Sequence, residues 1–181
     1  CLAETPPASI ATTQTILLLH ANQGGGERAI RDSSAQRRAL ASVGTPRILG
    51  AQKKFGNGSL YLDGSSHLGV PLSQDFELST EDFTVDLWAR LGVNQAYNPL
   101  VGLGDGNAAG RTTGWMLGVV SNQLSFYRYD GTAAMQRAVD WTPTLNTWYH
   151  LAAVRSGDAL RFYVDGVQVG ADQDVAGVDY S

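Results

Sequence analysis

The sequence lacks several features that would indicate a particular function. It has one cysteine, Cys1, so no disulfide can form within the chain, and a small cysteine-framed fold is excluded. Its apolar runs, such as Ile16–Leu19, fall far short of the roughly 20 residues that a membrane-spanning helix needs. Charged residues make up 17%, below the usual value of about 25%, and the net charge is −4. A general nucleic-acid binder is disfavoured, because phosphate contacts need a basic surface.

Signatures of common catalytic and metal sites are also missing. Gly24–Gly26 is not followed by the lysine of a phosphate-binding loop, and there is no Cys-x-x-Cys, His-Glu-x-x-His or Gly-x-Ser-x-Gly. The histidines, His20, His67 and His150, lie on separate segments. Histidines dispersed in this way are more often hydrogen-bonded strand residues than zinc ligands. No metal centre is therefore predicted.

The chain does contain a dense series of β-strand signals. Its 181 residues suit one domain, alone or with a tail, and 21 glycines with few charges favour strands and turns over exposed helices. From Phe55 onward, short apolar and β-branched runs alternate with turn residues. They predict strands at Ser59–Leu62, His67–Val70, Phe83–Leu91, Gly114–Val120, Gln123–Tyr129, Ala134–Val139, Trp148–Arg155, Ala159–Val164 and Val167–Gly170.

Two local patterns indicate how these strands assemble. Asp165-Gly166 separates two of them and supplies the positive φ angles of a two-residue hairpin turn. In Phe83–Leu91, apolar residues at 83, 85, 87 and 89 form one face, and the opposite face carries Thr84, Asp86, Trp88 and Arg90. These patterns predict an all-β fold, a sandwich of two antiparallel sheets.

The N-terminal part is less regular. Residues 1–14 are rich in Pro, Ala and Thr and predict a flexible linker or tail, followed by a strand at Thr15–His20. Glu27–Ser42 contains helix formers but no apolar stripe at helical spacing, which predicts mostly loop. Residues 1–60 carry seven Lys and Arg against three Asp and Glu, and residues 61–181 carry six against fourteen. The basic residues lack interleaved aromatic residues and indicate a solvated loop face.

Glycoside hydrolysis is the enzyme class to test, because some β-sandwiches perform it with two carboxylates about 5–10 Å apart. The nearest candidate is Asp86, which lies in the middle of a predicted strand. A same-face acid would have to lie two residues to either side, where the chain has Thr84 and Trp88. The sequence therefore predicts that the protein is not an enzyme of this type.

Three segments resemble a known family. Phe55–Gly64, Asp82–Arg90 and Asn146–Gly166 are similar, in this order, to the strand motifs of laminin-G-like domains of the concanavalin A-like lectin/glucanase superfamily. The last segment contains Trp-Tyr-His-Leu-Ala and then Phe-Tyr-Val-Asp-Gly. Ile16–His20 and Lys53–Ser59 look particularly like versions found in virion proteins of tailed bacteriophages.

The resemblance implies a jelly-roll over residues 15–181, with rim loops that bind glycans or proteins and without catalysis. It implies that Trp88, Trp148 and His150 are core or strand-pairing residues and that Glu27–Ser42 is strand and loop. Family members normally close with one more strand, which would follow the last residue, Ser181. We expect that either the sequence is truncated here or a partner covers the sheet edge or core strip left open.

Calcium is the one cofactor to consider. Family members that bind it place an acid just before the strand that here starts at Gly114, and this chain has Thr113 there. The Asp105-Gly-Asn107 segment supplies two side chains with oxygen ligands, fewer than the six to eight oxygens that calcium takes. No cofactor is predicted, and calcium is not favoured.

Sugar recognition needs a flat aromatic ring and side chains that hydrogen-bond to hydroxyls. The expected rim loops supply both types. The predicted ligand-binding residues are Tyr97, Asn98, Asp105, Asn107, Arg111, Tyr127 and Trp141.

Two functions remain open at this point. One is a virion surface protein, a capsid decoration or tail-fibre component, whose partners are other virion proteins, copies of itself or glycans. The alternative is a carbohydrate-binding module of a secreted or lipid-anchored bacterial surface protein, with Cys1 as the lipid carrier. Neither involves nucleic acid or a membrane span.

Overall fold

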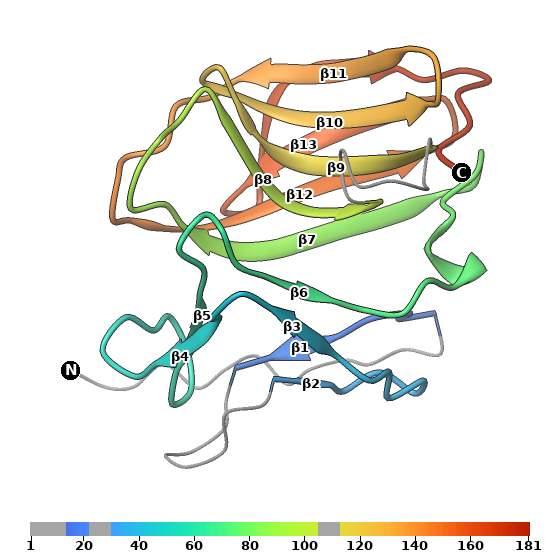
Figure 1. Cartoon of the computed structure of the whole chain (residues 1–181). Coiled ribbons are helices and arrows are strands. Elements are labelled where there is room, and N and C mark those ends of the chain that lie inside the picture. The colour runs from blue at the N-terminus through green and yellow to red at the C-terminus, as the bar shows by residue number, and fades with distance from the viewer. Residues whose placement is uncertain (1–13, 22–29, 105–112) are drawn as a thin grey trace. The chain divides into compact units, whose positions relative to one another are not determined.

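A computed structural model describes residues 14–21, 30–104 and 113–181 (Figure 1). The chain divides into two compact units, Cys1–Gln74 and Asp75–Ser181. The predicted linker at residues 1–14 lies almost wholly outside the described residues. The predicted sandwich lies in the second unit, and the first unit consists of short strand pairs.

In the first unit the described residues form three antiparallel strand pairs. They are β1 (Leu19–His20) with β2 (Arg31–Asp32), β3 (Ala41–Val43) with β6 (His67–Gly69), and β4 (Arg47–Leu49) with β5 (Ser59–Tyr61). Among the residues described here, no apolar side chain of this unit is buried. Polar contacts therefore carry a large share of its local order.

Asp32 makes the densest of these polar contacts. Its carboxylate accepts hydrogen bonds from the backbone N–H groups of Leu18 (3.0 Å), Ser34 (2.9 Å) and Arg38 (2.9 Å), and from the Ser34 hydroxyl (2.8 Å). Burial acts to raise the pKa of Asp32, but these hydrogen bonds outweigh it and lower the pKa to about 2. The charged carboxylate thus ties β1 and β2 to the loop that follows them.

Two four-stranded antiparallel sheets form the second unit, which the short 3-10 helix η1 (Gln74–Phe76) precedes. One sheet has the order β11-β10-β9-β8, from β8 (Tyr97–Leu103), β9 (Thr113–Val120), β10 (Gln123–Asp130) and β11 (Ala134–Asp140). The other has the order β14-β13-β12-β7, from β7 (Phe83–Arg90), β12 (Trp148–Ser156), β13 (Ala159–Val164) and β14 (Val167–Asp174). The sheets lie face to face in Figure 1, which confirms the predicted all-β sandwich.

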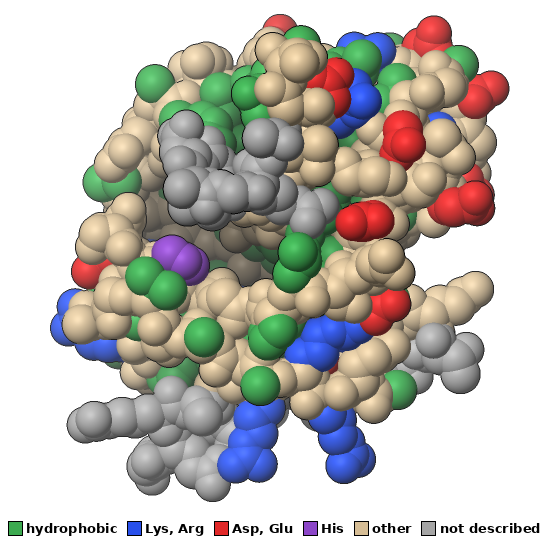
Figure 2. All heavy atoms as spheres, turned by 45° about the vertical axis from the view of Figure 1, so that its right-hand side comes forward, with side chains coloured by type: hydrophobic (Ala, Val, Ile, Leu, Met, Phe, Trp, Pro, Cys, Tyr) green, Lys and Arg blue, Asp and Glu red, His purple; other side chains and the backbone are tan. Residues whose placement is uncertain are grey.

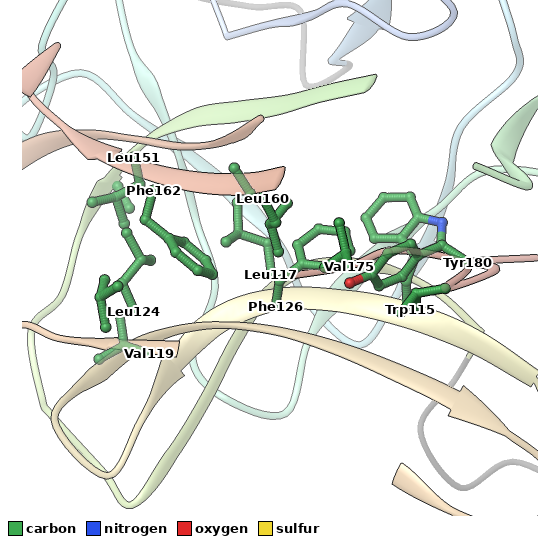
Figure 3. Close-up of a cluster of buried hydrophobic side chains, with 14 of the residues drawn as sticks. Trp115, Leu117, Val119, Leu124, Phe126, Leu151, Leu160, Phe162, Val175 and Tyr180 are labelled. Carbon is green, nitrogen blue, oxygen red and sulfur yellow. The ribbon is translucent and has the colours of Figure 1, made fainter. Parts of the chain in front are cut away.

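Alternate residues of the facing strands fill the space between the sheets. Figure 3 shows these side chains pointing toward one another; those with no exposed surface include Leu117, Val119, Leu124, Phe126, Leu151, Leu160 and Phe162. Phe126 stacks on Trp115, with ring centroids 5.6 Å apart, and on Phe83, at 5.3 Å. The indole N–H of Trp115 donates to the Phe76 carbonyl at 2.8 Å, so this buried ring has its polar atom satisfied.

Arg155 brings a charge into one end of this core. It is 3% exposed. Its guanidinium donates to backbone carbonyls of Gly157 (3.1 Å), Ser79 (3.3 Å), Val175 (3.3 Å) and Val178 (2.6 Å). The Tyr180 N–H donates to the Ser79 carbonyl at 2.9 Å, and the Tyr180 ring centroid lies 5.8 Å from the guanidinium carbon. Residues 175–180 therefore follow β14 as coil that is fixed to β12 and packs into the core.

Most strand predictions are confirmed. Every strand expected from Ser59 onward is present, and the Asp165-Gly166 turn has positive φ angles of 51° and 80°. The prediction at Thr15–His20 is wrong for most of its length, because the described strand covers Leu19–His20 only. β8 was not predicted. Pro99 and Gly102 break its alternation, and its register shifts between Pro99 and Val101.

Replacing Arg155 with Met should lower the free energy of unfolding by about 3 kcal/mol, because buried carbonyls then lose a charged donor. Urea denaturation measures this loss. Arg90→Met is the matched control, since Arg90 is only partly buried and its Nε donates to the Asn146 carbonyl at 3.0 Å. Equal losses in the two variants would contradict the role given to Arg155.

Asp32 should make stability depend on acid pH. Because its pKa of about 2 in the folded chain lies below the usual 3.8, its contribution is complete above about pH 4 and is lost as pH falls through 2. In Asp32→Asn, the free energy of unfolding should change less over this interval than in the parent chain. Asp158→Asn, in an exposed turn, should keep the parent profile, and a parent-like profile for Asp32→Asn would refute the assignment.

Candidate functional site

The outer face of the β8–β11 sheet brings together two of the predicted ligand-binding residues. Strand register places the side chains of this face in three successive rows, each crossing β8, β9, β10 and β11 in that order. The first row is Tyr97, Val120, Gln123 and Asp140, and the second is Pro99, Gly118, Ser125 and Ala138. The third row is Gly102, Met116, Tyr127 and Gln136. Tyr97 and Tyr127 therefore stand on either side of a row of short side chains. We call these three rows the tyrosine face.

The two tyrosines differ in exposure. Tyr97 is 53% exposed, whereas Tyr127 is partly buried. Burial raises the pKa of the Tyr127 hydroxyl, and the nearby Tyr97 raises it further. The Tyr97 hydroxyl is thus close enough to affect the Tyr127 hydroxyl electrostatically. Tyr97 thus offers a more exposed ring surface than the partly buried Tyr127.

Polar groups of the tyrosine face are held by hydrogen bonds. The Gln123 amide donates to Asp140 Oδ1 at 2.9 Å, and the Gln136 amide donates to Ser125 Oγ at 3.0 Å. Position 118, in the middle row, requires glycine. A Cβ there would lie 2.6 Å from the Asn98 carbonyl oxygen and 2.7 Å from the Met116 sulfur. The Met116 thioether lies across this glycine. Gly118 and Ser125 are therefore buried beneath neighbouring side chains, and oriented amide and carboxylate groups lie beside them.

Asn98, also predicted as a ligand contact, organises the segment before β8. Its Nδ2 group donates to Gln95 O (2.6 Å), Val119 O (3.1 Å) and Asn94 Oδ1 (3.2 Å), and its Oδ1 accepts the Gln95 N–H at 3.1 Å. Asn94 in turn donates to Asn122 Oδ1 at 2.8 Å. Asn98 is therefore a positioning residue that fixes the strand start at Tyr97.

The remaining predicted residues do not join this group. Trp141 follows β11, packs edge-on against Tyr149 with ring centroids 5.0 Å apart, and borders the core. Asp105, Asn107 and Arg111 lie outside the described residues, as does the loop considered for calcium. Within the described ranges, no group of three or more His, Cys, Asp and Glu is arranged to hold a metal ion.

The strand-pairing prediction for Trp88, Trp148 and His150 holds, but their side chains lie on an outer face. Trp88 pairs directly with His150, and Arg90 with Trp148, across β7 and β12. Trp88 is 37% exposed. The alternation of β7 already placed Trp88 on the same face as Asp86 and Arg90, so this signal was present in the sequence.

Asp86 has a histidine partner in place of a second carboxylate. Its Oδ2 lies 2.7 Å from His150 Nε2, and register places Ala152 opposite it. On the face of the second unit shown in Figure 2, Asp and Glu side chains are spread over the surface. No helix in the described ranges is long and apolar enough to span a membrane.

A family model described as the concanavalin A-like lectin/glucanases superfamily matches residues 62–180, more than half of the chain. The chain belongs to this superfamily. The match covers the whole described sandwich and confirms the resemblance seen in the strand motifs. A comparison with curated protein sequences gives no match.

Solved structures with a similar fold come from bacterial proteins. Domain 4 of AbnA, an extracellular arabinanase from Geobacillus stearothermophilus solved with arabinotriose, is 17% identical, with a TM-score of 0.55 over 82% of this chain and 73% of that one. Residues 221–444 of an S-layer domain-containing protein from Clostridium thermocellum are 18% identical, with a TM-score of 0.51 over 88% and 73%.

Botulinum neurotoxin type C, from a study of cell entry that depends on two ganglioside molecules, is a third similar structure. It is 14% identical, with a TM-score of 0.62. The similarity covers 92% of this chain and 40% of that one, so this chain spans less than half of the toxin structure. These likenesses show the superfamily fold.

The coupling of the two tyrosines can be tested without a ligand. In an NMR titration of ¹³C-labelled tyrosine, Tyr127 should ionise above pH 10, and Tyr97→Phe should lower its pKa only part of the way, because burial is the larger cause. Tyr163→Phe, on the other sheet, should leave Tyr127 unchanged. An unaltered Tyr127 pKa in Tyr97→Phe would show that the rings are not close.

Proposed function

We propose that this chain is a non-catalytic carbohydrate-binding domain and that it binds glycans at the tyrosine face. The observation that carries the proposal is the position of Tyr97 and Tyr127, which lie on either side of a row of short side chains on an outer sheet face of a lectin-superfamily domain. A sugar ring packs its apolar face on an aromatic side chain while fixed polar groups bond its hydroxyls.

The polar groups of the tyrosine face suit this role. Gln123 and Gln136 are each oriented by a hydrogen bond, to Asp140 and Ser125 respectively. An oriented amide can both donate to and accept from a hydroxyl group without first losing conformational freedom. We infer that Tyr97 stacks on the sugar and that the Gln123–Asp140 pair binds hydroxyls beside it.

The structural neighbours support a glycan ligand and a bacterial extracellular setting. One is a domain solved with arabinotriose, and one belongs to a toxin whose cell entry depends on gangliosides. The S-layer protein adds a cell-surface context. Of the two functions that the sequence left open, these neighbours favour the module of a secreted or lipid-anchored bacterial surface protein, and none of the three is a virion protein.

The proposal predicts binding to a panel of immobilised oligosaccharides that includes arabinotriose. Tyr97→Ala and Tyr127→Ala should each weaken binding at this face at least tenfold, a change of about 1.4 kcal/mol, because a stacking ring is lost. Isothermal titration calorimetry on the best ligand measures the change.

Tyr61→Ala is the matched control, since Tyr61 is a tyrosine of the first unit with 41% exposure. It should bind as the parent chain does. Failure of the parent chain to bind any glycan of the panel, or full binding by both tyrosine-face variants, would overturn the proposal.

A further inference from the structure

We infer that the outer face of the other sheet is a second binding site for an uncharged oligosaccharide, built around Trp88, His150 and Asp86. This inference rests on the proposed glycan-binding function and adds a site that the tyrosine face does not include. The two sheets enclose one core, so their outer faces lie on opposite sides of the sandwich.

Trp88 and His150 form the aromatic part of this site. They are opposite each other across β7 and β12, with ring centroids 5.3 Å apart and ring planes at 31°. Trp88 keeps 37% of its surface exposed although it has this neighbour. A partly exposed indole beside a second aromatic ring provides a flat apolar surface on which a sugar ring packs.

Hydrogen bonds hold the histidine in place. Its Nε2 bonds Asp86 Oδ2 at 2.7 Å, while its backbone N–H donates to Asp165 Oδ1 and its carbonyl accepts the Asp165 N–H, both at 2.8 Å. The Asp165-Gly166 hairpin turn thereby fixes the position of His150 on β12. The Asp86 side chain is 53% exposed, so its carboxylate can also accept a hydroxyl group from solvent or from a ligand.

Further hydrogen-bonding groups continue across the sheet from this cluster. Register places Asp86, Ala152, Tyr163 and Gln168 in one row over β7, β12, β13 and β14. Ala152 is short and buried, and Asp86 and Tyr163 lie on either side of it in this row. The tyrosine face has a similar arrangement, in which larger side chains lie on either side of a row of short side chains.

Charge favours an uncharged ligand. Arg161, the basic side chain beside Tyr163, is bound by Asp172 at 2.7 and 2.9 Å, and Asp172 also accepts the Gln168 amide at 2.9 Å. Residues 75–181 carry thirteen Asp and Glu against six Lys and Arg. A second arginine of this face, Arg90, donates to the Asn146 carbonyl at 3.0 Å. An acidic oligosaccharide would meet the excess of negative charge of this unit, whereas a neutral one meets hydrogen-bonding groups.

Two sites on opposite faces would let one domain hold two sugar segments. Sheets in a sandwich pack about 10 Å apart, so a ligand on one outer face is separated from the other by the full thickness of the molecule. A trisaccharide is too short to reach both. The predicted stoichiometry is therefore two neutral trisaccharides for each chain.

The test is a calorimetric and NMR titration of the whole 181-residue chain with arabinotriose, cellotriose and chitotriose, and with trigalacturonic acid as the charged comparison. Trp88→Ala removes the indole of the second site, and Tyr97→Ala removes the ring of the tyrosine face. We expect two neutral sugars for each parent chain, one for each single variant and none for the double variant, with at least tenfold weaker binding of trigalacturonic acid.

Folding is monitored through the indole N–H signal of Trp115, which is buried and bonded to Phe76. Should Trp88→Ala lose that signal, Asp86→Asn replaces it, since this change keeps the ring and alters only the hydrogen-bonding group. In the parent chain the Trp88 indole signal should shift on titration, and the Trp115 signal should not.

The outcomes separate the two proposals. Loss of all binding in Tyr97→Ala with no effect of Trp88→Ala overturns the second site and leaves the tyrosine face. Loss of all binding in Trp88→Ala with no effect of Tyr97→Ala supports the second site and overturns the tyrosine face. A parent chain that binds none of the neutral sugars overturns both.

Discussion

The alternation of buried and exposed residues, locked by the register between strands, is the constraint on which both outer faces depend. Leu151 and Phe162 have no exposed surface, so a shift of one residue in β12 or β13 would turn them to solvent. The same shift in β12 would turn His150 inward, away from Asp86, at the cost of burying a polar ring without its partner. The apolar core therefore determines which residues reach each surface.

The end of the core depends on a different interaction. Residues 175–180 form no strand, so their carbonyls need partners from elsewhere, and Arg155 supplies them. A guanidinium suits this task because it is always charged and offers five donors in a fixed plane. One atom stays unsatisfied among the described groups: the Tyr180 hydroxyl is buried without a hydrogen-bond partner. Packing of its ring on Phe126 and Phe83 outweighs that cost.

Sequence patterns were sufficient for the sandwich but less so for the sites. Period-two alternation and the Asp165-Gly166 turn are local signals, and the strands they predicted are present. β8 was missed because Pro99 and Gly102 are poor strand formers, and only pairing with β9 holds them extended. The role of Asn98 depends on the Val119 carbonyl, 21 residues away, which no local pattern reveals. The predicted ligand-binding residues all stay predictions, and Asp105, Asn107 and Arg111 lie outside the described residues.

Trp88 shows how alternation and average burial can disagree. Tryptophan is highly buried on average, but Trp88 lies on the outer face that the alternation of β7 predicts. In a half-buried strand the alternation is the stronger evidence, because the opposite face is already filled by Val85, Leu87 and Ala89. An aromatic residue out of phase with the core must lie at the surface, where its exposed ring costs free energy unless something covers it. A sugar ring can pack on such a side chain, since one face of the sugar ring is apolar and its hydroxyl groups lie at the edges.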